Sequence, residues 1–499
     1  MAVTKAHIQW IGLIAGPVLA VIVYMALPDS YAGADGAHMP FTQAGHITAA
    51  LALWIAIWWM TEAISIYATA LLPLAVLPTS GAMPIRQAAA PYANELIYLF
   101  MGGFMLALAM QRWGLHRRFA LTVLHYVGSR PDRLIGGFMV VTAILSMWVS
   151  NTATTIMMLP IALSVIELAK RSDGDLSAED NNFTPCLLLA IAYSASIGGI
   201  GTLIGTPPNL FLASYIKDNL NQEISFVRWM GVGIPLVVVF LPLVWLIMTR
   251  KIFPVRRTHL EGDRVTKTQA GHDLGPMSRG EWSILAVFLV TVFAWIFRPL
   301  LSSAEIFGAK PLGGLTDPGI AILAALALFV VPVEVKKRVF IIDWDTAKKL
   351  PWEVLVLFGG GLSLAAAIRI NGVGEFLGNQ VGSLAGIPDI FFVVIVIAML
   401  IYLTELTSNT ATTATLIPIL ASLAPGLGFH PYMLIVPAAI AASCAFMLPV
   451  ATPPNAIVFG SGQVTMQQMI HAGLWLNIIG IVIITLVAYT VMISVLGIQ

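Results

Sequence analysis

The sequence predicts an all-α polytopic membrane protein with about 11 transmembrane helices and two re-entrant hairpins, arranged as two inverted-topology repeats. Of the 499 residues, 58% are hydrophobic and only 10% are charged, against a usual charged share of about 25% in soluble domains. Several apolar runs exceed the roughly 20 residues that a membrane helix needs. Polar segments that occur twice, in the same order, divide the chain into two halves.

The duplication is visible in three pairs of segments. SNTATT at 150–155 returns unchanged at 408–413, ELIYLFMGG at 95–103 resembles EVLVLFGGG at 353–361, and GTPPN at 205–209 resembles ATPPN at 451–455. Two homologous halves whose polar breaks converge on one central site are typical of secondary transporters built from internal repeats.

The basic residues predict the orientation of the chain. Lys and Arg gather near 112–133, 250–267 and 336–349, whereas the loop near 29–37 has neither. Because short cytoplasmic loops carry an excess of basic residues, we expect a cytoplasmic N-terminus and an external C-terminus. We expect an integral protein of the bacterial inner (plasma) membrane. Basic residues grouped between apolar runs do not indicate a nucleic-acid partner.

The apolar runs then take their places in order. The domain organisation predicted is a first transmembrane helix at 1–28, repeat one at 29–249, a cytoplasmic basic linker at 250–281 and repeat two at 282–499. The candidate full spans lie near 8–28, 43–61, 63–80, 93–111, 186–216, 229–249, 282–299, 318–334, 352–370, 431–459 and 472–496.

Two further segments, 133–170 and 388–424, carry the SNT motifs and are predicted to be hairpins. The apolar runs on either side of the first motif are each about 16 residues, or about 24 Å as helix, which is short of the ~30 Å hydrocarbon core. A single crossing by 133–170 would also place the basic 250–267 loop outside. The first hairpin is therefore expected to enter and return on the cytoplasmic side, and the second from outside, so that the two tips meet at the midplane.

The residue types at the tips indicate the ligands. Ser, Thr and Asn offer neutral oxygen atoms that suit a small alkali cation, and sodium fits best. Helices restart after each SNT motif and each Thr-Pro-Pro-Asn break, so four positive helix ends could face one anion. Neither SNT motif has a nearby Lys or Arg. A dianion would therefore need bound cations to balance its charge, and sodium should bind first.

These motifs resemble one known family over essentially the whole chain. The paired SNT motifs, the GTPPN and ATPPN breaks and the basic loop between the halves are similar to those of the divalent anion:sodium symporters, which include sodium-coupled di- and tricarboxylate transporters. The resemblance implies a homodimer in which each protomer has a scaffold domain and a mobile transport domain, working by an elevator motion.

The resemblance also implies the site residues. One sodium ion would be held by Ser146, Ser150, Asn151 and Gly205, and a second by Thr404, Thr407, Asn409 and Ala451. At Thr407 a smaller residue would serve if only its carbonyl coordinates. The residues expected to contact the substrate carboxylates are Asn151, Thr152, Thr206, Pro207, Asn409, Thr410, Thr452 and Pro453.

Glu405 is an acidic residue immediately before the second SNT motif. Carboxylates inside a membrane are costly, so Glu405 is a candidate proton carrier. Its counterpart in the first half is Met147, which favours a structural hydrogen bond instead.

The function predicted is import of C4-dicarboxylates of the succinate, malate or fumarate type by sodium symport. A sodium-independent dicarboxylate exchanger on the same fold, or sulfate or tricarboxylate transport, remains an alternative, and a channel or a membrane enzyme is a third class. The sequence has no G-x-x-x-x-G-K-[ST] loop for ATP, and no HExxH or GxSxG motif that would indicate an enzyme. Cys186 and Cys444 lie in apolar surroundings and are expected to be small core residues.

Overall fold

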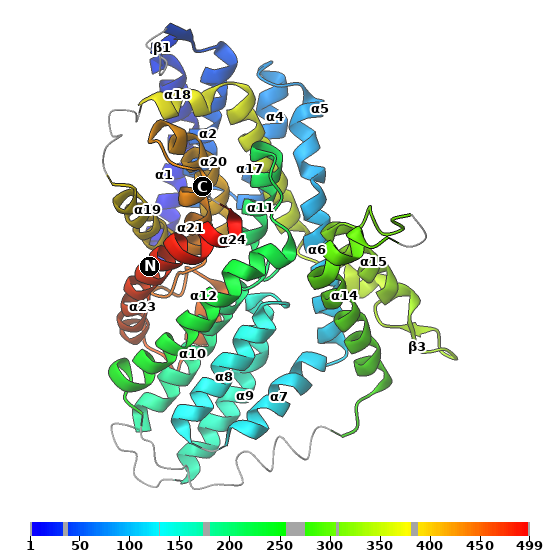
Figure 1. Cartoon of the computed structure of the whole chain (residues 1–499). Helices are drawn as coiled ribbons and strands as arrows, with labels where there is room; N and C mark the ends of the chain where they lie inside the picture. The colour runs from blue at the N-terminus through cyan, green and yellow to red at the C-terminus, as the bar shows by residue number, and fades with distance from the viewer. Residues whose placement is uncertain are drawn as a thin grey trace.

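The protein is a helical membrane protein, seen here in a computed structural model (Figure 1). The structure describes residues 2–32, 38–128, 130–172, 180–255, 275–305, 309–380 and 388–497. Within these ranges, eight helical segments are long and apolar enough to cross a membrane: Ala6–Ala26, Gln43–Thr61, Ile85–Arg112, Asn182–Gly199, Phe226–Ile252, Arg279–Ser303, Trp352–Ile370 and Met466–Leu496.

The elements of the first half follow the order of its apolar runs. They are α1 (Ala2–Ala26), β1 (Ser30–Ala32), β2 (His38–Pro40), α2 (Gln43–Thr61), α3 (Ile66–Thr69), α4 (Leu72–Thr79), α5 (Ile85–Ala89), η1 (Ala90–Ala93), α6 (Glu95–Arg112), α7 (Leu115–Val127), α8 (Pro131–Ser146), α9 (Asn151–Ser172), α10 (Asp180–Gly199), α11 (Pro207–Leu220), α12 (Phe226–Ile247) and the π-turn η2 (Met248–Ile252). Side-chain caps start several of them, as where Thr42 accepts from Gly45 N and Asn94 from Leu96 N.

The second half repeats much of this order. It contains α14 (Arg279–Ser303), α15 (Asp317–Val330), β3 (Pro332–Glu334), β4 (Val339–Phe340), α16 (Trp344–Ala347), α17 (Trp352–Ile370), α18 (Val373–Gln380), α19 (Asp389–Thr404), α20 (Asn409–Gly426), α21 (Tyr432–Ala442), α22 (Pro453–Gly460), α23 (Met466–Val487), the π-turn η4 (Ala488–Met492) and α24 (Ile493–Leu496). The strands β1 and β2, and β3 and β4, form two small antiparallel pairs.

Two helix pairs turn at the SNT motifs. Four residues separate α8 from α9 and four separate α19 from α20, so each pair doubles back within one short turn. The α8–α9 pair comes from the end of the molecule where α7 lies, whereas α19 and α20 come from the end where β1 and α18 lie (Figure 1). Packing agrees with this view, since α7 packs on α8 and α18 on α20.

Four of the expected spans differ from the helices observed. Spans 186–216 and 431–459 are each two helices with a break between them, because the Thr-Pro-Pro sequence removes N–H donors and starts a new helix. Residues 63–80 form the short helices α3 and α4, after Glu62 ends α2 in a left-handed conformation (φ 48°). The span expected at 318–334 ends earlier, at Val330, where β3 follows almost directly.

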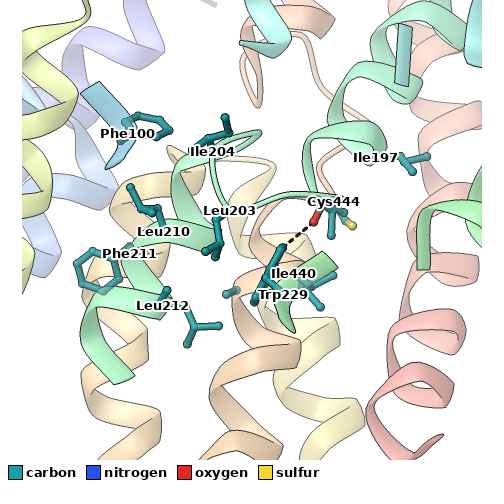
Figure 2. Close-up of a cluster of buried hydrophobic side chains, with 14 of the residues drawn as sticks. Phe100, Ile197, Leu203, Ile204, Leu210, Phe211, Leu212, Trp229, Ile440 and Cys444 are labelled. Carbon is teal, nitrogen blue, oxygen red and sulfur yellow. Dashed lines mark hydrogen bonds between the residues drawn. The ribbon is translucent and has the colours of Figure 1, made fainter. Parts of the chain in front are cut away.

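The helices around the breaks form the core. In α10, 94% of the apolar stretch is buried inside the protein. The corresponding share is 17% in α1 and α14, so these two helices are exposed along most of their length. Figure 2 shows Leu203, Leu210, Phe211 and Trp229 around the break that follows α10. The indole Nε1 of Trp229 donates to Ile200 O at 2.9 Å, so α12 is fastened to this break.

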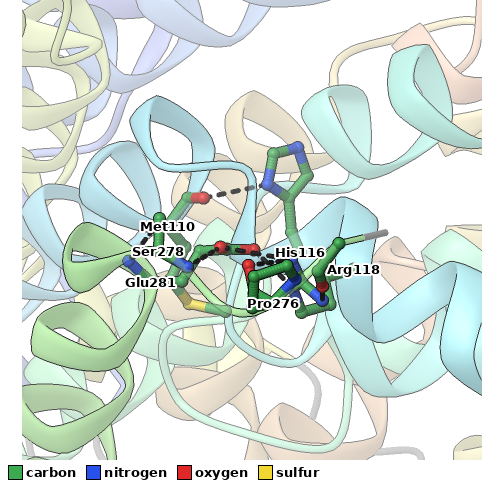
Figure 3. Close-up of polar contacts among 7 residues, drawn as sticks. Met110, His116, Arg118, Pro276, Ser278 and Glu281 are labelled. Atoms are coloured by element: carbon green, nitrogen blue, oxygen red, sulfur yellow. Dashed lines mark hydrogen bonds and ion pairs between the residues drawn. The ribbon is translucent and has the colours of Figure 1, made fainter. Parts of the chain in front are cut away.

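Polar contacts at the α7 end hold the start of α14. Arg118 of α7 lies 2.5 Å (Nε) from Glu281 Oε1, and its Nη1 donates to Gly275 O at 3.0 Å (Figure 3). Glu281 and Ser278 form a capping box at the N-terminus of α14. Burial lowers the pKa of His116, the neighbouring imidazole of α7. Residues 256–274, most of the expected basic linker, lie outside the described residues.

We predict that the two hairpins open to opposite sides of the membrane. Arg133→Cys and Lys170→Cys should react with a membrane-impermeant maleimide from the cytoplasmic side alone, and Ile390→Cys from the outside alone. Background labelling should be low because Cys186 and Cys444 are both 0% exposed. Labelling of positions 133 and 170 from opposite sides would show instead that this segment crosses the membrane.

Candidate functional site

The tip of the first hairpin gathers oxygen atoms around Asn151. Ser146 ends α8 and is fully buried, with its Oγ 2.5 Å from Asn151 Oδ1 and 2.7 Å from Ala195 O. Ser150 caps the next helix, since its Oγ accepts from Ala153 N at 3.3 Å. Asn151 itself is the first residue of α9.

The orientation of the Asn151 amide depends on what lies between these oxygen atoms. With Nδ2 turned inward, the amide donates to Ser146 Oγ (2.5 Å), Ala195 O (3.1 Å) and Gly205 O (3.3 Å). With Oδ1 turned inward, four oxygen atoms face one another, and Ser146 has one proton to share. The first arrangement satisfies the empty cluster; the second suits a cluster of ligands around a small cation.

The break between α10 and α11 supplies the other side of this cluster. Asn209 Nδ2 donates to Gly199 O (3.2 Å), Ile200 O (3.3 Å) and Thr202 O (2.8 Å), which holds the loop in one shape. Thr202 Oγ1 donates to Met147 O at 2.5 Å and accepts from Gly205 N at 3.1 Å, so the break is tied to the tip.

Two glycines let the break and the tip approach. A Cβ on Gly199 would lie 2.7 Å from Asn151 Oδ1, and one on Gly205 would lie 2.4 Å from Gly199 O. Neither position could accept a larger residue without moving the Asn151 amide or the loop.

The second half builds a matching cluster. Thr404 ends α19, and its Oγ1 lies 2.7 Å from Asn409 Oδ1 and 3.0 Å from Ala442 O. Asn455 takes the role of Asn209, with Nδ2 donating to Ala445 O and Leu448 O, both at 3.1 Å.

Glu405 distinguishes the second half from the first. Its Oε1 accepts from Phe446 N (2.7 Å), Met447 N (2.9 Å) and Asn477 Nδ2 (2.8 Å), and its Oε2 accepts from Met447 N (3.0 Å) and Leu448 N (3.1 Å). The carboxylate is 3% exposed. It therefore satisfies the backbone N–H groups that the break after α21 leaves free, in agreement with the structural role expected from the sequence.

Each half contributes a short helix to the other half's hairpin. The helix α11 packs against α20 and α21, and α22 packs against α9 and α10. Thr206 and Thr452, both extended, precede α11 and α22, whose first residues are Pro207 and Pro453. The start of α9 lies beside the start of α11, since the Asn151 amide faces Gly205 O, and helix N-termini favour an anionic ligand.

Some of the residues expected to contact the substrate have free hydroxyls, and others are engaged in contacts within the protein. Within the described part of the chain, the hydroxyls of Thr152, Thr206 and Thr410 have no hydrogen-bond partner, so they are available to a ligand. Thr452 Oγ1 accepts from Asn455 N at 3.3 Å, and Pro453 is exposed.

The expected cation residues divide in the same way. Ser146, Asn151 and Gly205 come together, as do Thr404 and Asn409. The Thr407 hydroxyl is used inside the hairpin, 2.6 Å from Thr412 Oγ1 and 3.0 Å from Leu403 O. Ala451 N donates to Leu448 O within its break.

Sequence reasoning missed the carbonyl groups of the clusters. Ala195 and Ala442 contribute backbone oxygen atoms, for which side-chain identity gives little signal. Sequence reasoning also missed the residues that hold the breaks: Thr202, Asn209 and Asn455. The asparagine recurs at the end of both GTPPN and ATPPN, and this repetition was the signal that could have revealed its role. The described residues contain no group of three or more His, Cys, Asp or Glu arranged to hold a metal ion.

A family model described as the sodium:sulfate symporter transmembrane region matches residues 9–497. The chain belongs to this family of divalent anion:sodium symporters. The protein is thus an integral membrane transporter and not an enzyme.

Curated relatives of this symporter match along nearly its full length. It is 42% identical over 495 residues to the sodium-dependent dicarboxylate transporter SdcS of Staphylococcus saprophyticus, covering 98% of this chain and 93% of the relative. It is 43% identical over 499 residues to SdcS of Staphylococcus aureus, covering 98% and 92%.

Two solved structures share the fold of this symporter. They are the YdaH transporter of Alcanivorax borkumensis (TM-score 0.57, 13% identity, 99% of this chain and 98% of that one) and MtrF of Neisseria gonorrhoeae (TM-score 0.59, 11% identity, 97% and 94%). At these identities the likeness concerns the fold alone.

We predict that Asn151→Ala and Asn409→Ala each reduce uptake to background while the protein remains folded. Each amide contacts the hydroxyl of its cluster, and alanine would remove that polar group. Uptake into proteoliposomes and size-exclusion profiles would be measured beside Asn379→Ala, an amide of α18 away from both tips. Near-normal uptake by either variant would refute the assignment of the site.

We predict that Glu405→Ala lowers the stability of the purified protein by on the order of 3 kcal/mol, because it leaves buried N–H donors without an acceptor. The stability of Glu405→Gln should lie between those of Glu405→Ala and the wild type, because the amide oxygen keeps one of the two acceptor atoms. Thermal unfolding gives the order of the three proteins. A Glu405→Gln protein as stable as wild type, whose transport had lost its pH dependence, would favour the proton-carrier role instead.

Proposed function

We propose that this protein imports C4-dicarboxylates of the succinate, malate or fumarate type by sodium symport. The observation that carries the proposal is the matched pair of clusters at the hairpin tips, each with a hydroxyl, an Asn amide and a backbone carbonyl around one point. The first would hold sodium through Ser146, Asn151 and the carbonyl of Gly205, with Ser150 at its edge. The second would use Thr404 and Asn409 with backbone oxygen atoms of Thr407 and Ala451.

The substrate would lie between the two clusters. Free hydroxyls of Thr152, Thr206 and Thr410, together with the amides of Asn151 and Asn409, can donate to two carboxylates, and Thr452, Pro207 and Pro453 shape the helix starts beside them. Helix ends offer about half an elementary charge each, and their attraction fades within a turn. They need bound sodium to balance a dianion in a low-dielectric cavity.

The architecture supports an elevator motion of a transport domain against a scaffold, with 11 spans and two hairpins in two inverted repeats. Helices α8, α9, α10, α12 and α22 pack on one another, and α6, α14 and α15 form a second packed set. By this scheme the N-terminus is cytoplasmic, the C-terminus is outside, and scaffolds pair in a homodimer. The names of the SdcS relatives, which are sodium-dependent dicarboxylate transporters, support the substrate class and the coupling ion.

A sodium-independent exchanger on the same fold is the second candidate, with sulfate or tricarboxylate as further substrates. The observation in its favour is the Asn151 amide itself, which can satisfy the empty cluster through Nδ2 without a cation. The two candidates differ in whether substrate binding needs sodium.

We predict that sodium increases the apparent affinity for dicarboxylate and that potassium does not replace it. Because binding free energies are reciprocal, succinate should raise the affinity for sodium by the same factor. Calorimetry on purified protein should show tight succinate or malate binding in sodium buffer and weak binding in potassium or choline buffer. Equal binding in sodium-free choline buffer would favour the exchanger.

A further inference from the structure

Trp148 lies in the turn of the first hairpin, between Ser146 and Ser150, and its ring packs outside the hairpin. It is stacked near Phe226 of α12 (centroids 6.0 Å apart, interplanar angle 24°) and Trp295 of α14 (6.5 Å, 12°), and it meets Phe288 of α14 edge-on (5.2 Å, 88°). Phe226 and Trp295 stack on each other at 4.5 Å and 13°. We name Trp148, Phe226, Phe288 and Trp295 the aromatic joint.

A buried ion pair anchors the joint to α15. Asp317, 3% exposed, accepts from Phe226 N through Oδ2 (2.8 Å) and from Trp295 Nε1 through its backbone O (3.1 Å). Its Oδ1 lies 3.0 Å from Arg298 Nε, a charge contact that is not aligned as a hydrogen bond. Arg298 also pairs with Glu223 in the loop before α12 (Nη1 to Oε1, 3.0 Å). The first turn of α12 is therefore fixed to α14 and α15.

The same turn of α12 holds both parts of the first oxygen cluster. Phe226 packs on Trp148, two residues from Ser146, and Trp229 donates to Ile200 O, next to Gly199 in the break. A shift of this turn would move the tip and the break relative to each other. The distances among Ser146, Asn151 and Gly205 thus depend on contacts made outside the cluster.

The second hairpin lacks this connection. In the repeat, Leu406 occupies the position of Trp148 and is 69% exposed, while Glu405 binds the break directly. The first tip is aligned with its break through aromatic rings and α12; the second is aligned through a carboxylate.

We propose that Trp148, Phe226, Trp295 and Asp317 are positioning residues that set the sodium affinity of the first cluster from outside it. This inference rests on the proposed function, because it needs a sodium ion at that cluster. Losing the joint removes no ligand atom, but it allows the tip to move away from the break. Sodium binding would then also have to restore the alignment of the tip with the break, which lowers the sodium affinity.

The test measures the sodium concentration that half-maximally stabilises purified full-length protein against thermal unfolding, with choline keeping ionic strength constant. Trp148→Leu and Trp295→Leu should each raise this midpoint roughly two- to tenfold, the range expected for losing an aromatic pair. Their double variant should be less than additive, because both remove the same contact. Trp148→Phe should restore most of the wild-type midpoint.

Matched variants separate positioning from general stability. Phe293→Leu removes another ring of α14, which is 54% exposed and contacts Phe297 outside the joint in a tilted arrangement, and should leave the sodium midpoint unchanged. Phe288→Leu removes a smaller ring of the joint and would replace Trp295→Leu if that variant did not fold. Variants that melt at lower temperature but keep the wild-type sodium midpoint would overturn the inference while leaving the sodium site intact. A wild-type protein with no response to sodium would overturn the proposed site and the inference together.

Discussion

The structure depends on one constraint: wherever a helix stops inside the membrane, its free N–H and C=O groups must find partners within the protein. Asn209 and Asn455 meet this need in the two breaks by donating to carbonyl groups of the loops. Glu405 meets it for the N–H groups of Phe446, Met447 and Leu448. The breaks are thus rigid, and rigidity allows them to present the remaining groups to a ligand.

The polar groups that are not needed to satisfy the breaks form the proposed site. The carbonyls of Ala195 and Ala442 accept from the hydroxyls of Ser146 and Thr404, and among the described residues three threonine hydroxyls near helix N-termini have no hydrogen-bond partner. In the proposed site, cation ligands and anion donors are therefore adjacent, with Asn151 and Asn409 belonging to both sets. A cation and a carboxylate bound at such neighbouring points attract each other strongly away from bulk water, which is the physical basis of coupling between them.

Repetition in the sequence was enough to predict the two tips, the two breaks and the pairing of Ser146 with Asn151 and Thr404 with Asn409. It failed where the outcome depends on distant contacts. The span expected at 63–80 is instead the two short helices α3 and α4, which come after a left-handed turn at Glu62 that no local pattern announces. The hydroxyl of Thr407 bonds Thr412 inside the hairpin, and Trp148 packs on α12 and α14, contacts that sequence spacing alone does not reveal.

The two halves solve the same alignment problem by different means, and this has an electrostatic consequence. Glu405 places a carboxyl group against the second break, where it accepts from backbone N–H groups, whereas Met147 brings no such group to the first. In its ionised form this carboxylate would attract a cation at the proposed second cluster of Thr404 and Asn409 and would repel a substrate carboxylate. The second cluster should accordingly fill with sodium at lower concentration than the first. The proposed first cluster has no fixed charge of its own, so sodium bound there would depend on the alignment that Trp148 holds and on the charge of a neighbouring substrate carboxylate.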